Sequence, residues 1–276
     1  MFPGFQPQYR AGCGFPLTRP ACLSVEIQGI RMVGEKEPGR GPEWALTGWS
    51  GWTNGGDTRG GAEPFPEADG GFRTDVYYSG RDITLEGVLE APTHEAFVRE
   101  AERFGTLLTE PRWDWLTVDE QHLGMRRMIL VHRQGPPLLT QESDRVGVFT
   151  LRVSSSMWQR VSTETSSLSL PVGGTGTAVN AGDYPADLSI ELVGPIKNPR
   201  VTFNNTTWWQ YNGELTAGET RTVNVTRRII RNPAAGVRLD SSGSGEWPRL
   251  APGATTVKVT GGLAGTVNLS WRSSWR

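Results

Sequence analysis

The sequence predicts a mainly β protein of two domains that carries a single α-helix. Three observations lead to this class. The chain has 276 residues, which is long for one domain and comfortable for two. Its hydrophobic content of 36%, with 35 Gly and 19 Pro, favours short strands joined by turns over packed helices. Short segments that alternate polar and apolar residues recur along the chain.

The first domain is expected to span residues 1–165 and to begin with a half-buried strand. In CLSVEIQGI the apolar residues alternate with polar ones, namely Leu23, Val25 and Ile27. Ile83 and Leu85 mark the next strand. The segments WDWLTVD, MRRMILVHRQ and RVGVFTLRVSSS predict three more strands.

Between the first two of these strands, residues 33–72 are rich in Gly and Pro and are predicted to form a long excursion without regular structure. The excursion also contains four large aromatic residues, Trp44, Trp49, Trp52 and Phe65. Disordered segments are poor in aromatic residues, so we expect the excursion to dock on its own domain or on a neighbouring subunit. These four residues are the candidates for a subunit or partner interface.

One helix is predicted over residues 93–109. Thr93 is the expected N-cap, and Glu95 lies in the first turn, where the helix dipole favours an anion. A single apolar stripe repeats along the helix through Phe97, Ala101, Phe104 and Leu108. A helix with one narrow stripe is expected to cover a sheet.

The polar segment STETSSLSLPVGGTGTA is interpreted as a linker over residues 162–177. The second domain is then expected over residues 178–276. It contains the short alternating segments ADLSIELVG, PRVTFNN, TRTVNVTRRII, ATTVKVT and TVNLSWRSSW, separated by turn signals. Regularly spaced short strands of this kind are typical of a β-sandwich.

The charge and the termini bear on the class of partner. A formal net charge of −1 argues against binding nucleic acid or a membrane surface by bulk attraction. The sequence has no apolar run long enough to span a membrane and does not begin like a signal peptide, so we expect neither. Cys13 and Cys22 are expected to be free thiols in a reducing cell. Arginine far outnumbers lysine, as a GC-rich coding genome would produce and as bidentate interface contacts would also favour.

No arrangement of residues predicts catalysis. The spacing of His94, His122 and His132 does not favour a shared metal site. Asp114, with Asp119 and Glu120 nearby, is the best candidate for the paired carboxylates of sugar hydrolysis. Strand alternation instead predicts that Trp113 and Trp115 share a buried face and that Asp114 lies on the solvated one. We therefore predict no catalytic residue, no cofactor and no metal.

A second aromatic cluster lies in TTWWQYNGEL. Trp208 and Trp209 are adjacent, so one side chain should face the core of a strand and the other should face outward. The outward side chain could contact a glycan or a partner subunit.

The order of these segments resembles the distal tail proteins, or minor tail proteins, of long-tailed bacteriophages. The similar parts are YYSGRDITLEGVLEAPTHEAFVREAERFGTLL and the series YPADLSIELVGPIKNPRVTFNNTTWWQYNGELTAGETRTVNV, WPRLAPGATTVKVT and TVNLSWRSSWR. These are patterns of strands and turns, and they cover about nine-tenths of the chain. With the arginine bias, the resemblance points to an actinobacteriophage.

The resemblance implies an N-terminal β-barrel-like domain with one helix and a C-terminal galectin-like β-sandwich. It also implies a homohexameric ring at the virion tail tip, assembled in the bacterial cytoplasm, with a channel for the tape measure protein and DNA. The implied partners are other copies of the chain, the tail tube protein and the baseplate hub or tail-associated protein. A structural protein without enzymatic activity is thus the first hypothesis. The alternative is a carbohydrate-binding sandwich that holds a host surface glycan through Trp208 or Trp209.

Overall fold

The computed structural model describes residues 23–34, 41–53, 58–65, 67, 69, 71–73, 75, 77–109, 113–234, 236–238 and 242–276. The chain divides into two compact units, Met1–Arg160 and Val161–Arg276. Each unit has a hydrophobic core of its own. The protein is mostly strand, as predicted.

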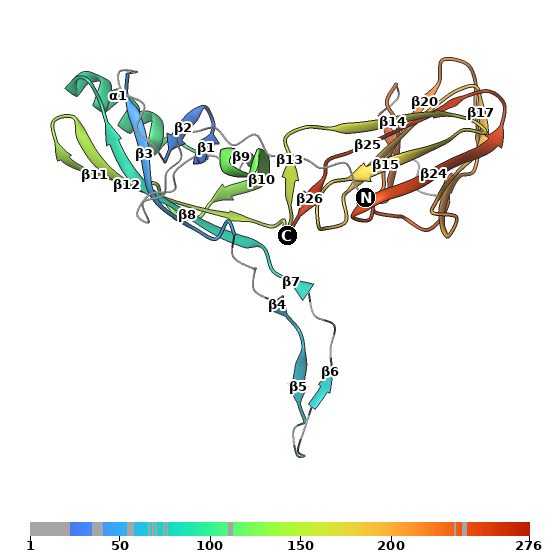
Figure 1. Ribbon diagram of the computed structural model, residues 1–276, viewed down its shortest axis with the longest axis horizontal. Helices are drawn as coiled ribbons and strands as arrows, with labels where there is room; N and C mark the ends of the chain where they lie inside the picture. Colours follow the sequence, from blue (N-terminus) through green and yellow to red (C-terminus); the bar gives the residue numbers. More distant parts are fainter. Residues whose placement is uncertain are drawn as a thin grey trace. The chain divides into compact units, whose positions relative to one another are not determined.

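The first unit contains a closed seven-stranded β-barrel (Figure 1). Its strands, in their order around the barrel, are β12 (Val146–Ser155), β8 (Arg81–Glu90), β3 (Glu43–Ser50), β2 (Ile30–Val33), β1 (Leu23–Ile27), β9 (Asp114–Glu120) and β10 (Met125–Arg133). Pairing of His132 with Ser154 and of Arg133 with Val153 joins β10 to β12 and closes the barrel. β11 (Leu138–Ser143) is added to β12 outside the closed circuit, and a short 3-10 helix, η1 (Gln121–Leu123), joins β9 to β10.

Strict alternation builds the barrel core. Along β8 and β12, every second residue is buried, so one face of each strand points into the barrel and the other points outward. Gly87 of β8 is required by this packing, because a Cβ there would lie 2.1 Å from the carbonyl oxygen of Ala45 and 2.5 Å from Cζ of Phe149.

The predicted helix is confirmed as α1 (His94–Gly105), which lies beside β11 and β12 (Figure 1). Thr93 caps it as predicted, since its Oγ1 accepts a hydrogen bond from the backbone N–H of Ala96 at 3.2 Å. Phe104 packs with its ring centroid 5.0 Å from Trp44 and 5.5 Å from Phe149. The helix therefore covers the inner side of the sheet with one apolar stripe.

The prediction that residues 33–72 lack regular structure was wrong for β3. This strand lies between β2 and β8, parallel to the first and antiparallel to the second. Its alternation is interrupted by a register shift between Leu46 and Gly48, which hid the strand period in the sequence. The rest of the excursion carries a ladder outside the barrel, in which β4 (Thr58–Arg59) pairs with β7 (Tyr77–Tyr78) and β5 (Ala62–Pro64) pairs with β6 (Gly71–Arg73).

The second unit consists of two antiparallel sheets around one core, as expected for a β-sandwich. One sheet has the order β14 (Ser166–Pro171), β25 (Thr266–Trp271), β16 (Leu188–Val193), β20 (Thr220–Asn224), β21 (Ile229–Asn232) and β22 (Val237–Arg238). The other has the order β15 (Thr175–Asn180), β24 (Gly253–Gly262), β17 (Ile196–Phe203), β18 (Thr207–Tyr211) and β23 (Gly243–Gly245), with β19 (Glu214–Leu215) on β17. β13 (Arg160–Ser162) spans the division between the two units, and β26 (Ser274–Trp275) is a short strand near the last residue of the second unit.

The residues expected to form a linker, 162–177, instead contribute β14 and the first part of β15. Both strands pair over six positions with strands from the end of the chain. Leu168 and Leu170 point to one face of β14, and Ser167 and Ser169 lie on the solvent side. A strand with so few apolar residues resembles a polar linker in sequence, and this explains the wrong prediction. The division between the two units lies at residues 160 and 161 and not within 162–177.

Candidate assembly surfaces

The three histidines lie at separate places in the first unit. His94 begins α1, with Nδ1 2.8 Å from the carbonyl oxygen of Asp144. His122 is exposed in η1, and the ring of His132 on β10 lies 4.4 Å from that of Trp113. Within the described residues, no group of three or more His, Cys, Asp or Glu side chains could hold a metal ion. Cys13 and Cys22 lie outside the described residues.

The candidate carboxylate pair does not have the geometry of a glycosidase. Asp114 and Glu120 stand at the two ends of β9, and six residues of strand span about 20 Å. Glycosidase carboxylates lie about 5–10 Å apart. Asp114 accepts a hydrogen bond from the backbone N–H of Trp115 at 2.7 Å, whereas Glu120 is buried in an ion pair with Arg127.

The burial predicted for Trp113 and Trp115 was wrong, because these side chains are 44% and 38% exposed. The residues of β9 that point into the barrel are Leu116, Val118 and Glu120. The strand therefore has the opposite phase to the one that the aromatic residues suggested.

One end of the barrel contains a cluster of buried charges around Trp52. Arg127 donates to Oε2 of Glu120 from Nε at 2.7 Å and also from Nη2. The guanidinium of Arg160 lies 5.3 Å from the centre of the Trp52 ring, at the range of a cation–π contact. A pocket of about 410 Å³ opens beside this cluster, lined by Leu23, Trp49, Thr53, Glu120, His122, Leu123, Arg127 and Arg160.

Arg81 makes contacts at the place where the excursion begins, near Trp52, and ends, near Tyr78. It donates from Nη1 to the carbonyl oxygen of Trp52 at 2.8 Å and from Nε to that of Trp158 at 2.8 Å. Tyr78, at the end of the ladder, stacks on Trp158 with ring centroids 4.3 Å apart. Burial lowers the pKa of Arg81 below its usual value, and the charge of Arg127 lowers it further. One end of the excursion is thus held through the backbone of Trp52, and the other through the ring of Tyr78.

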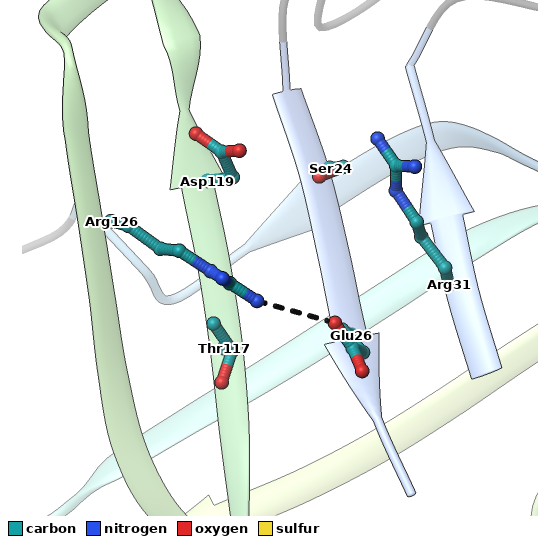
Figure 2. A pocket seen from close by; sticks show the side chains of 6 residues that line it. All are labelled: Ser24, Glu26, Arg31, Thr117, Asp119 and Arg126. Atoms are coloured by element: carbon teal, nitrogen blue, oxygen red, sulfur yellow. Dashed lines mark hydrogen bonds and ion pairs between the residues drawn. The ribbon is translucent and has the colours of Figure 1, made fainter. Parts of the chain in front are cut away.

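A shallow groove of about 270 Å³ lies on the outer face of β1, β2, β9 and β10 (Figure 2). Its lining is polar and carries charges of both signs, and it is formed by Ser24, Glu26, Arg31, Thr117, Asp119 and Arg126. Arg126 reaches across β9 to Glu26, with 3.4 Å between the charged atoms. Both side chains are about half exposed, so the pair contributes little to stability and leaves a polar surface of both signs.

The four aromatic candidates of the excursion fall into two groups. Trp44 and Trp52 are buried in the barrel core, and Trp49 is half-buried with its ring stacked 5.9 Å from that of Trp52. These three dock on their own domain, which was one of the two expectations. Phe65 follows β5 in the ladder and is 43% exposed.

The adjacent tryptophans of β18 divide as expected. Trp209 is fully buried in the sandwich core, and Trp208 is half-buried on the outside. The guanidinium of Arg200 lies 4.1 Å from the centre of the Trp208 ring, and a Cβ at Gly245 would lie 2.7 Å from that ring. Trp208 is therefore packed by its own domain, whereas a glycan-stacking residue presents an open ring face.

Sequence reasoning missed two surface features of the first unit. Within the described residues, β11 pairs with β12 alone, so its other edge has no strand partner. Leu138 and Val148 on the outer side of these two strands are 58% and 45% exposed. The alternation of RVGVFTLRVSSS does contain this signal, because a strand with Phe149 and Leu151 inside must place Val148 outside.

No protein-family model and no curated protein matches the sequence. Among solved structures, the crystal structure of the Dit protein of phage SPP1, described as a paradigm of the hub adsorption apparatus in phages that infect Gram-positive bacteria, has a TM-score of 0.63. It is 11% identical, and the match covers 91% of this chain and 98% of that one. The phage P2 baseplate in its activated conformation matches at a TM-score of 0.45, with 6% identity for the structure with Ca and 7% for the one with Sr, over 90% of this chain and 97% of each matched chain.

The chain therefore has the fold of a phage Dit protein along nearly its whole length. No helix in the described part of the chain is long and apolar enough to cross a membrane.

Proposed function

We propose that this chain is a structural protein of the tail tip of a long-tailed bacteriophage and has no catalytic role. Copies of it form a ring that joins the tail tube to the baseplate hub or tail-associated protein. The ring surrounds the channel for the tape measure protein and DNA, and the resemblance to distal tail proteins supplies the expected number of six copies. The protein assembles in the bacterial cytoplasm and remains in the virion.

The observation that supports this proposal most strongly is the extent of the fold likeness to SPP1 Dit. It covers 91% of this chain, so it includes both the barrel and the sandwich. A fold shared by one common domain would say little, because many functions occur on one fold. Two successive domains of different architecture are shared by far fewer unrelated proteins, so a likeness over both says more about function.

Two surface features fit a protein that meets other copies of itself. As far as the chain is described, the outer edge of β11 has no strand partner, and soluble proteins usually cover or protect such an edge. The excursion is fixed at its base by Arg81 and carries the exposed Phe65 beyond it. We propose that Phe65 contacts an adjacent subunit or a tail partner.

Electron microscopy tests the structural role. Virions labelled with an antibody against the chain should carry the label at the tail tip, and purified protein should form rings of uniform diameter. A phage that lacks the gene should produce no infectious tails. Intact, infectious virions without the protein would contradict the proposal.

The contact of Phe65 is tested by Phe65→Ala, with Leu263→Ala in the second unit as the matched control, since both side chains are exposed. Tails assembled with the first variant should lose a large share of their infectivity, and tails with the control should not. Equal infectivity of the two variants would remove Phe65 from the interface.

A further inference from the structure

The pocket beside Trp52, at one end of the barrel, combines apolar walls with buried charge. Its volume of about 410 Å³ lies within the range of small-molecule sites, about 300–1,000 Å³. Leu23, Trp49 and Leu123 supply the apolar part of its lining. All of its lining residues belong to the first unit, so the pocket is complete within one copy of the chain.

The side chains that line this pocket carry an excess of positive charge. Arg127 and Arg160 both line it and are buried, as is Glu120. Glu120 is the only acidic side chain among the described residues of the lining, so two positive charges and one negative charge leave a sum of +1. His122 is the other titratable residue of the lining, and an imidazole is either neutral or positive. The sign of the sum is therefore positive in either state of His122.

Arg127 acts as a cation on its surroundings although it is paired with Glu120. Burial lowers the pKa of Arg81 most, and the charge of Arg127 lowers it further. The guanidinium groups of Arg127 and Arg160 lie 6.0 Å and 5.3 Å from the centre of the Trp52 ring, which attracts cations but has no net charge. Because charges interact strongly where water is largely excluded, an anion in the pocket would be favoured.

The size of the excess charge favours a carboxylate over a phosphate. The planar guanidinium group matches both anions geometrically. A carboxylate carries one negative charge, which equals the excess. A phosphate monoester carries about −1.5 to −2 at neutral pH and would leave negative charge beside the buried carboxylate of Glu120. The apolar walls further require that the carboxylate be attached to an apolar body.

We propose that this pocket binds a small organic acid. Its carboxylate is directed to Arg127 and Arg160, and its apolar body lies against Leu23, Trp49 and Leu123. A ligand that binds only the folded chain also stabilises it, so the acid should raise the unfolding midpoint of the first unit. The site does not depend on the ring of the proposed function, and the failure of either proposal leaves the other standing.

Three probes of similar shape test the chemistry of the site, each titrated against the full chain by ligand-observed NMR. Phenylacetate should bind with a Kd of about 1 mM or less, as expected for a ligand of this size. Phenylacetamide has the same shape without the charge and should bind at least about tenfold more weakly, the change expected when a charge interaction of ~1.4 kcal/mol is lost. Phenyl phosphate should also bind more weakly than phenylacetate. Absence of phenylacetate binding, equal binding of the amide, or tighter binding of the phosphate would each overturn the proposal.

Two variants at one exposed position locate the binding in this pocket. Leu123→Asp and Leu123→Lys remove the same apolar side chain and place opposite charges beside the pocket. Phenylacetate should bind about tenfold more weakly to the first variant than to the second, since one repels and the other attracts the carboxylate. The control Leu263→Asp, at an exposed position of the second unit, should bind like the unaltered chain. Circular dichroism and the unfolding midpoint check that the variants fold, and equal affinities of the two Leu123 variants would place the binding elsewhere and refute the site.

Discussion

Glu120 and Arg127 form an ion pair with almost no exposure to solvent, next to Arg81 and Arg160 at one end of the barrel. The carboxylate of Glu120 accepts two hydrogen bonds from Arg127. Pairing of this kind is required because a buried charge without a partner is strongly destabilising. The sequence showed these residues only as alternate members of two strands, because the pairing depends on the register of β9 with β10.

Replacement of Glu120 tests this pair. Glu120→Gln should lower the free energy of unfolding of the first unit by about 3–5 kcal/mol, because Arg127 then remains buried beside two other arginines. Urea denaturation followed by tryptophan fluorescence measures the change. The double variant Glu120→Leu/Arg127→Met should recover most of the loss, and equal stability of the single and double variants would contradict this account.

The aromatic residues of the excursion should differ sharply in their effect on stability. Trp44→Ala should cost about 3–5 kcal/mol, because its ring packs against Phe104 and Phe149 in the core. Phe65→Ala should change stability by no more than about 0.5 kcal/mol, since Phe65 lies on the surface. Thermal unfolding of the two variants compares them, and a large loss with Phe65→Ala would show that the ladder stabilises the fold.

At the scale of elements, the helix was predicted well and two sets of strands were not. Thr93 and the stripe through Phe97 and Phe104 carry a local signal, because capping and helical period depend on residues within a few positions. β3 was missed because the register shift near Leu46 breaks its alternation. β14 and β15 were missed because their pairing partners lie far along the chain, from Gly253, which pairs with Asn180, to Trp271, which pairs with Ser166.

The candidate surfaces also depend on pairing between distant strands and not on local signals. The exposure of Trp113 and Trp115 is set by the phase of β9, which is fixed by pairing with β1 and β10 and not by the side chains themselves. The open edge of β11 depends on the order of strands in the sheet. Neither property has a local signature, so neither could be predicted from the sequence.

Gly87 of β8 should tolerate no side chain. Gly87→Ala should destabilise the first unit by about 1–3 kcal/mol, because the added Cβ meets the Ala45 carbonyl and the Phe149 ring. The matched control is Gly105→Ala at the end of α1, where a Cβ would meet nothing within 4 Å. That change should be neutral or stabilising by up to about 1 kcal/mol. Chemical denaturation of both variants checks the sign, and a neutral Gly87→Ala would show that the sheet adjusts.

At the scale of the whole molecule, the two units have separate cores with no residue in common. The first contains the barrel and α1, and the second contains both sheets of the sandwich. Since each core closes on residues of its own unit, the units should fold independently.

Residues 161–276 expressed alone should therefore fold. Their amide spectrum should be dispersed and should superimpose on the corresponding signals of the full chain. The midpoint of thermal unfolding should agree with one of two transitions of the full chain. A fragment that is unfolded at room temperature would show that the second core depends on the first unit.

Arg81, Tyr78 and Trp158 make the contacts that hold the two ends of the excursion. The polypeptide beyond these contacts, about residues 58–76, lies in the sequence between Trp52, whose carbonyl oxygen accepts a hydrogen bond from Arg81, and Tyr78, whose ring stacks on Trp158. Its replacement by a foreign peptide of similar length should leave the barrel intact. Under the proposed function, this position would serve for displaying an epitope or an enzymatic tag on a phage particle.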